Sequence, residues 1–290
     1  MKIPRIGYLQ RAVRQIKKRF ASRALILMYH RVAEVGSDPW SLCVKPRHFG
    51  EHLEVLQKYG RPMQLQQLVQ ALRDGNLPHR AVAITFDDGY ADNLYNAKPL
   101  LESYNIPATV FLTTGYIRCA GEFWWDELDR ILLQPGILPK KICLKIDGTT
   151  HQWELGEASY YNEDEYQRCR HLKAWDGKPG SRHFLCYSLW HLLHPLPEDE
   201  RRKALNEIMT WASTEPAIRP AYRSLSLEEV GTITQGKLVE VGAHSVTHPN
   251  LSKLTVASQL DEIQRSKAYL EEILDRPVTS FAYPYGCYTV

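Results

Sequence analysis

The chain has 290 residues, of which 44% are apolar, and this is enough for one large α/β domain or two small ones. Its formal net charge of +3 is too weak to indicate a nucleic-acid partner, and we expect none. No stretch approaches the roughly 20 apolar residues of a membrane-spanning helix.

Residues 1–23 are predicted to form a basic amphipathic arm. They carry eight Lys and Arg residues and no acid, and their apolar residues recur at helical spacing. No apolar stretch of signal-peptide length follows. We therefore expect a cytoplasmic protein. The arm either makes peripheral contact with an anionic membrane surface or packs on the domain as a solvated first helix. The six cysteines form no CxxC pair, which predicts reduced thiols.

The first half of the chain alternates apolar runs of strand length with amphipathic helices. The expected strands are residues 23–32, 80–89 and 107–114, and the expected helices are 46–60, 64–75 and 91–105. We expect Gly60 and Gly75 to end the first two helices. Continuous apolar strands joined by helices indicate βα units and a parallel sheet.

The alternation of strands and helices ends near Gly115, and residues 117–224 are predicted to form a polar, aromatic insertion. They predict helices at 122–133 and 198–213, and a hairpin at 141–155 that turns at Asp147-Gly148. The βα rhythm then resumes. It predicts a helix at 226–237 with a capping box of Ser226 and Glu229, a strand at 238–244, a helix at 257–275, and a strand and turn at 278–286.

Chemistry-bearing residues follow two of the predicted strands. Asp87 and Asp88 end an apolar strand, where adjacent carboxylates are costly unless one is neutralised. His244 and His248 stand four residues apart after another strand. Carboxyl ends of parallel strands meet at one face, so Asp88 and the two histidines predict a three-ligand site for a divalent metal, with Zn²⁺ as the default and Co²⁺, Ni²⁺ or Mn²⁺ as alternatives. The alternative is that Asp88 or Asp92 caps helix 91–105 and the histidines are surface residues.

Three motifs occur in order: "TFDDG", "HSVTH" and "YPYG". Over about residues 24–290 they resemble the polysaccharide deacetylases, the NodB-homology domain of carbohydrate esterase family four. The resemblance implies a distorted (β/α) barrel that removes N-acetyl groups from an N-acetylated sugar of a polysaccharide or glycolipid, as a metal-dependent hydrolase acting on carbon–nitrogen bonds other than peptide bonds.

The resemblance also implies residue roles. Asp88, His244 and His248 would hold the metal, and Asp87 would be the general base. Pro284 and Tyr285 would line the acetyl-sugar site, with the Tyr285 backbone N–H as oxyanion donor. His30 would face the pocket, although a structural role fits it equally well. We expect His191 and His194 to be packing or surface residues.

The sequence departs from the family pattern near its end. The family places further strands and a general-acid histidine downstream of "YPYG", and the sequence stops at Val290. Ala282 also stands where an Arg often holds the base. We therefore expect the barrel without its C-terminal strands. Besides the deacetylase, two alternatives remain: a truncated, catalytically impaired protein that binds metal and glycan, and an amidase for a non-sugar amide. The sequence does not indicate an oligomeric state.

Overall fold

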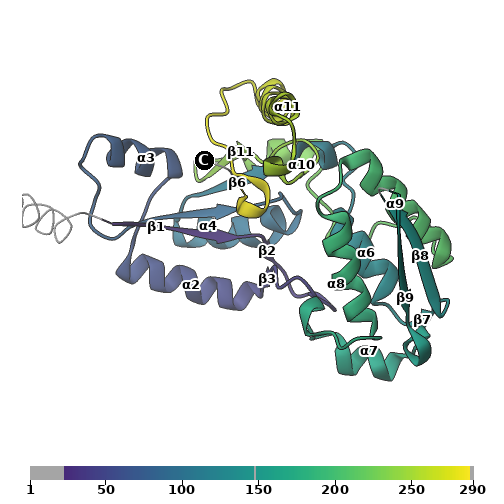
Figure 1. The fold of residues 1–290 in the computed structure, drawn as a ribbon. Helices are drawn as coiled ribbons and strands as arrows, with labels where there is room; N and C mark the ends of the chain where they lie inside the picture. Colours follow the sequence, from purple (N-terminus) through teal and green to yellow (C-terminus); the bar gives the residue numbers. More distant parts are fainter. Residues whose placement is uncertain (1–22, 147, 288–290) are drawn as a thin grey trace, which may run out of the picture.

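The computed structural model describes residues 23–146 and 148–287. A parallel five-stranded sheet lies at its centre, in the order β1-β5-β6-β11 with β4 also paired to β5 (Figure 1). Its strands are β1 (Ala24–Tyr29), β4 (Arg61–Pro62), β5 (Ala81–Phe86), β6 (Ala108–Leu112) and β11 (Val239–Ala243). The predicted α/β class with a parallel sheet is confirmed. The predicted arm lies outside the described residues apart from Arg23.

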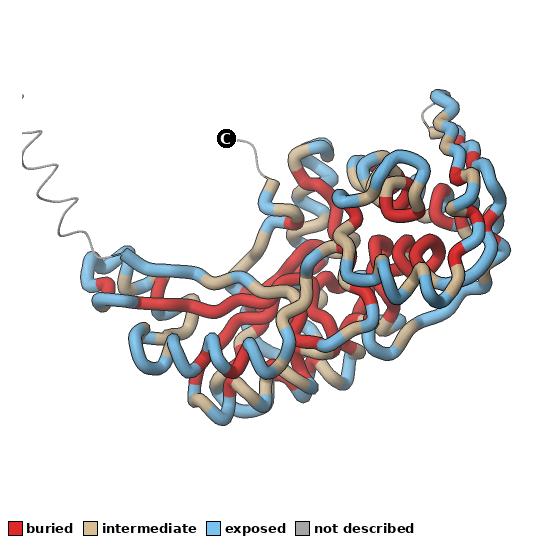
Figure 2. The backbone as a smooth tube through the Cα atoms, turned by 90° about the horizontal axis from the view of Figure 1, so that it is seen from below, coloured by how far each residue is buried: buried red, intermediate tan, exposed pale blue. Residues whose placement is uncertain are grey.

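The sheet register brings the carboxyl ends of the inner strands to one level. Every residue of β5 and β6 is buried, as the continuous apolar runs predict. Phe86 in β5 pairs with Val110 in β6, and Val110 pairs with Val241 in β11. The residues that follow these strands therefore emerge at the same edge of the sheet. In Figure 2 the strands form the buried centre of this half of the molecule.

Helices cover the sheet. They are α2 (Pro46–Tyr59), α3 (Leu65–Arg73), α4 (Lys98–Tyr104), α5 (Thr114–Ile117), α10 (Leu227–Ile233) and α11 (Val256–Leu274). The capping box of Ser226 and Glu229 is present, as predicted. α2 and α3 end just before Gly60 and Gly75, as predicted. Gly75 has a left-handed φ of 68°, and Gly60 has an extended φ of −100°. Helix 91–105 divides into a π-helical turn, Asn93–Ala97, and α4.

A second region, rich in helices and aromatic residues, lies beside the sheet (Figure 1). It contains α6 (Trp124–Leu132), β7 (Gly136–Ile137), β8 (Lys141–Ile146), β9 (Thr149–Glu154), β10 (Tyr160–Tyr161), α7 (Glu163–Cys169), α8 (Arg182–Leu193) and α9 (Glu198–Trp211). β8 and β9 form the predicted hairpin. The region has an apolar core of its own, built around Trp124, Leu128, Leu189 and Leu205. A separate apolar cluster packs on the sheet, around Phe49, Phe86, Val110 and Leu270.

Short elements complete the fold. They are β2 (Arg31–Val32), β3 (Cys43–Val44) and the 3₁₀ turns Gly156–Ser159, Ala174–Asp176, Pro220–Tyr222, Leu251–Lys253 and Pro284–Gly286. The strand predicted within 278–286 is wrong, because the segment makes one isolated bridge, from Phe281 to Ala243, and then turns. Pro284 has no N–H for a strand ladder, and Tyr285 has a left-handed φ of 59°.

Two general predictions concern the whole chain. All six cysteines are free, as expected. Within residues 23–146 and 148–287, no helix combines the length and the apolar character needed to cross a membrane.

Candidate metal centre

Asp87 and Asp88 leave the end of β5 in a tight turn. The N–H of Asp87 still donates to Tyr29 in β1, at 2.9 Å, so the sheet fixes its backbone. Asp88 and Gly89 then have left-handed φ values of 72° and 85°. A Cβ on Gly89 would lie 2.5 Å from Cδ2 of Leu112. Glycine is therefore required both by the backbone conformation and by the close approach of β6.

The two histidines belong to the loop that follows β11. His244 follows the strand directly, and its N–H donates to Leu112 in β6 at 2.9 Å. Ser245 and His248 have left-handed φ values of 65° and 56°, and the His248 N–H donates to Oγ of Ser245 at 3.1 Å. Non-glycine residues in this conformation are strained and gather at functional sites. The loop turns His248 back towards the end of β5.

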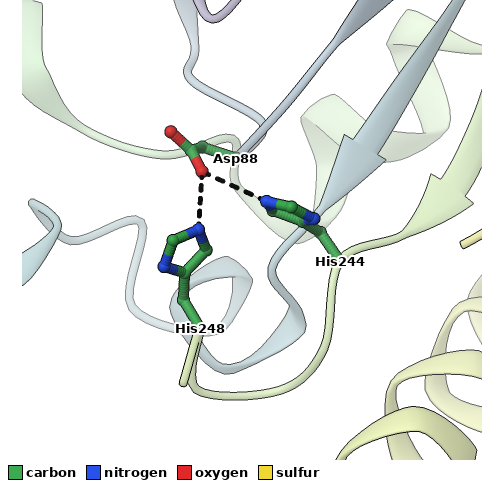
Figure 3. A group of neighbouring side chains, drawn as sticks. All are labelled: Asp88, His244 and His248. Carbon is green, nitrogen blue, oxygen red and sulfur yellow. Dashed lines mark ion pairs between the residues drawn. The ribbon is translucent and has the colours of Figure 1, made fainter. Parts of the chain in front are cut away.

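The structure brings Asp88 and both histidines together (Figure 3). Oδ1 of Asp88 lies 3.5 Å from Nε2 of His244 and 3.2 Å from Nε2 of His248. All three residues are buried. Neither Asp88 nor Asp92 caps the following helix, so that alternative is wrong. The Asp88 carboxylate faces the two histidines, and the Asp92 carboxylate accepts from the Arg31 side chain and the Val32 N–H.

The hydrogen bonding of His244 indicates whether this cluster can bind a cation. Its Nδ1 lies 3.0 Å from the carbonyl oxygen of Ala282, and a carbonyl only accepts, so Nδ1 carries a proton. In a neutral ring, Nε2 then directs a lone pair towards the Asp88 carboxylate. Two facing acceptors repel unless a cation, either a metal ion or a proton on Nε2, lies between them. The residues therefore fit a bound cation, with the Ala282 carbonyl orienting the ring as outer partners of metal-binding histidines do.

Ligand atoms bound to a small divalent metal at about 2.0–2.2 Å with tetrahedral angles lie about 3.3–3.6 Å apart. The distances from Oδ1 of Asp88 to the His244 and His248 nitrogens, 3.5 and 3.2 Å, are close to this spacing. All three ligand atoms lie within 4.8 Å of one another. A soft-metal thiolate site is not formed, because the cluster contains no cysteine.

Burial and neighbouring groups shift the pKa values of the two aspartates in opposite directions. Burial raises the pKa of Asp87, and Asp88 adds to this effect while His244 opposes it. Burial would also raise the pKa of Asp88, but hydrogen bonds with His244 and His248 hold it below its ordinary value. Asp88 thus remains an anion at the centre of the cluster. Burial lowers the pKa of His244, but Asp88 and Asp87 raise it above its ordinary value, whereas burial keeps the pKa of His248 below its ordinary value.

These residues line a cavity of about 600 Å³, within the range of small-molecule sites. Of the predicted site residues, His30, Asp87, Asp88, His244, His248 and Tyr285 line it. Pro284 is buried beside Tyr285 and is not among the lining residues. The Tyr285 ring packs on His248, with ring centres 4.6 Å apart.

Aromatic residues that the sequence analysis did not assign to the site line the rest of the cavity. They are Trp40, Trp125, Trp175, Tyr187, Trp190 and His191. His191 is an exposed surface residue, as expected, and it also lines the cavity. His194 packs against Trp190 and Tyr285, as expected. The spacing of Tyr187, Trp190 and His191 puts them on one helix face, which was the available signal.

Comparison with known proteins agrees with this geometry. The polysaccharide deacetylase family model matches residues 74–137 and 210–290, which together make up half of the chain. The chain therefore belongs to the polysaccharide deacetylase family. Both aspartates and both histidines fall within the matched residues, and residues 138–209 fall between them.

Several curated relatives and solved structures are similar to the chain, among them two relatives and one structure described next. It is 33% identical to YxkH of Bacillus subtilis over 101 residues, which are 33% of this chain and 34% of that protein. It is 30% identical to a poly-beta-1,6-N-acetyl-D-glucosamine N-deacetylase of Staphylococcus aureus over 121 residues, which are 37% of this chain and 41% of the relative. Each match thus spans well under half of the relative.

The solved structure is the Streptococcus pyogenes deacetylase PplD in complex with acetate. It aligns with a TM-score of 0.52 at 18% identity, over 92% of this chain and 75% of that one. At this identity the likeness shows the fold, which is the α/β fold of NodB-type deacetylases.

Proposed function

We propose that this protein is a metal-dependent hydrolase that removes N-acetyl groups from an N-acetylated sugar of a polysaccharide or glycolipid. One observation carries the proposal. Three buried acceptor atoms, from Asp88, His244 and His248, converge beside a second carboxylate, Asp87, in one cavity. Amide hydrolysis needs this combination of a cation site and a free base.

In this proposal Asp88, His244 and His248 hold a divalent metal, with Zn²⁺ as the first choice for a set of one carboxylate and two imidazoles. Such a metal, when bound, polarises the amide carbonyl and makes water more acidic. Asp87 takes the proton from the attacking water, and an equivalent proton goes to the amine nitrogen as the carbon–nitrogen bond breaks. Because Asp87 is buried and its pKa is raised, it is a stronger base than an ordinary surface aspartate.

The remaining predicted residues bind the substrate. Tyr285 has a left-handed φ of 59° in the turn that crosses the cavity, and we assign its backbone N–H to the oxyanion that forms on the acetyl carbon. His30 lines the same cavity as Asp87, which supports a role beside the proposed base. We assign His30 and Pro284 to the acetyl-sugar site.

The matched relative from Staphylococcus aureus is a poly-beta-1,6-N-acetyl-D-glucosamine N-deacetylase. Oligomers of this sugar are therefore the first substrates to test. The purified chain, loaded with Zn²⁺ or Co²⁺, should release acetate from them, a chelator should stop the release, and returning the metal should restore it. If no acetate is released from any N-acetylated oligosaccharide with any of these metals, the proposal is wrong.

A further inference from the structure

We propose that three rings from the segment outside the family match, Trp175, Tyr187 and His191, form a second sugar subsite. We call these residues the aromatic rim. The rim would bind the sugar unit next to the one that is deacetylated, and so make the enzyme selective for oligomers over single acetylated units. This inference rests on the proposed function and adds a recognition role to a segment that the family pattern does not cover.

The rim rings are available to a ligand. Trp175 is 49% exposed, although a tryptophan usually buries most of its surface. His191 is also exposed, and Tyr187 is half-buried. All three line the cavity that contains Asp87 and the metal cluster, so a molecule bound at the cluster and extending outward meets them.

The rim is held in place by packing behind it. Trp190, between Tyr187 and His191 on the same face of α8, packs against Trp40 with ring centres 5.7 Å apart. It also meets Tyr285 at 6.1 Å, and Tyr285 in turn packs on His248. One chain of contacts therefore fixes α8 relative to the proposed metal ligands. A subsite built on a helix in this way is more rigid than one built on a loop.

Trp175 is anchored separately. It lies in the turn Ala174–Asp176, and the Ala174 N–H donates to the carbonyl of Pro39 at 2.9 Å. Lys173, next to this turn, donates to the backbone carbonyl of Asp38 at 3.0 Å. The turn is therefore joined to the loop that carries Trp40, which also lines the cavity. Trp175 and α8 reach the same space from two anchored elements.

The chemistry of the rim suits a sugar ring. A pyranose has C–H groups on its faces and hydroxyls at its edges. Aromatic faces bury the C–H surface, while the Tyr187 hydroxyl, the His191 ring nitrogens and the Trp175 N–H provide hydrogen-bonding groups. A hydrocarbon chain would leave these polar groups unpaired. A cavity of about 600 Å³ also has room for much more than an acetamide group.

The test compares two substrates across four forms of the protein. The substrates are the tetramer of β-1,6-linked N-acetylglucosamine and an umbelliferyl acetate ester that has no sugar. The variants are Trp175→Ala, Tyr187→Ala and the control Tyr160→Ala, whose ring is 57% exposed in the same segment but does not line the cavity. Each rim variant should lower the ratio of kcat/KM for the tetramer to kcat/KM for the ester by about 2- to 10-fold, mainly through KM.

The control should leave this ratio unchanged. Equal losses on both substrates, losses in kcat alone, or a control that behaves like the rim variants would overturn the rim proposal.

Calorimetric binding of the tetramer to metal-loaded protein separates the rim proposal from the proposed function. If the wild type binds the tetramer without releasing acetate, the proposed function fails, and weaker binding by Trp175→Ala still supports the rim. If the tetramer does not bind, or binds equally to the variant, the rim proposal is wrong.

Discussion

The carboxylate of Glu262 in α11 holds Thr247 at two points. Oε2 accepts from the Thr247 N–H at 2.9 Å, and Oε1 accepts from its hydroxyl at 2.8 Å. Oε2 also accepts from the Val246 N–H at 2.7 Å. From the opposite region of the molecule, Arg201 in α9 donates to the Thr247 carbonyl at 3.0 Å. The strained loop between His244 and His248 is therefore fixed from both sides.

Glu262→Gln should weaken metal binding. The neutral amide keeps one acceptor oxygen for the two backbone N–H groups and can only donate to the Thr247 hydroxyl, so the three charge-assisted bonds are weakened and His248 is held less firmly. We expect the dissociation constant for Zn²⁺ to rise about tenfold, at the low end of outer-shell effects, with a changed visible absorption spectrum of the Co²⁺ form. Glu272→Gln, the same change at an exposed position of α11, is the control. Matching affinities and spectra for the two variants would contradict this role.

Substitutions of Asp87 and of Asp88 should have different effects, the first on turnover and the second on metal binding. Asp87→Asn should lower kcat about 10²- to 10⁴-fold, the usual contribution of a general base, and keep the metal bound. Asp88→Asn or His244→Ala should raise the metal dissociation constant by more than the roughly 10–100-fold of outer-shell changes. Metal content after dialysis and single-turnover acetate release measure the two effects. Loss of metal from Asp87→Asn would show that the two roles are reversed.

Gly89→Ala should destabilise the fold more than Gly75→Ala. Both glycines have left-handed φ, of 85° and 68°, so alanine is strained at either position. Only at Gly89 would the new Cβ meet a side chain, Leu112, at 2.5 Å. We expect about 1 kcal/mol of lost stability at Gly75 and about 1–3 kcal/mol more at Gly89. Urea unfolding of the two variants measures the difference, and equal losses would mean that Leu112 moves aside freely.

Asp126 should make stability depend on pH. Burial raises its pKa to about 8, while Arg31, the Tyr90 hydroxyl and Arg219 oppose the shift and Asp129 adds to it. The folded pKa thus lies above the unfolded value of about 3.8. The stability that protonated Asp126 contributes is complete below the unfolded pKa and is lost as the pH rises through the folded pKa.

Asp126→Asn should remove this dependence, because an amide keeps an acceptor for the Tyr90 hydroxyl without ionising. The free energy of unfolding, measured across this pH range, should favour the variant increasingly over the wild type towards pH 8. Asp164→Asn, at an exposed position in α7, is the control and should follow the wild type. Parallel curves for wild type and Asp126→Asn would contradict the buried, protonated state.

The sequence predicts the centre of the site because local patterns determine it. Buried strands are recognisable from continuous apolar runs, and parallel strands end at the same edge of the sheet. Asp88 could therefore be paired with His244 and His248 without knowing the fold in detail. The wrong strand at 278–286 has a local reason too, since the left-handed φ of Tyr285 has no strong signal in a residue other than glycine.

The rim could not be predicted in the same way. Tyr187 and His191 reach the cavity because α8 docks beside the sheet, and docking depends on contacts far apart in sequence, such as that of Trp190 with Trp40. Helical periodicity shows which residues share a face, but not what that face meets. Glu262 was missed for a similar reason, because its partners lie 15 and 16 residues away on another element.

The two apolar cores have a consequence for how this protein can change. The groups proposed for the chemistry stand at strand ends of the sheet core, whereas Tyr187 and His191 of the rim stand on α8, whose Leu185 and Leu189 belong to the second core. Substitutions of exposed residues in α8 or near Trp175 can therefore change which substrates fit the cavity without moving the ends of β5 and β11. Substrate range can thus vary through the rim side chains, whereas an exchange of residues 138–209 between relatives must keep the Arg201 bond to Thr247 and the Trp190 contact with Tyr285.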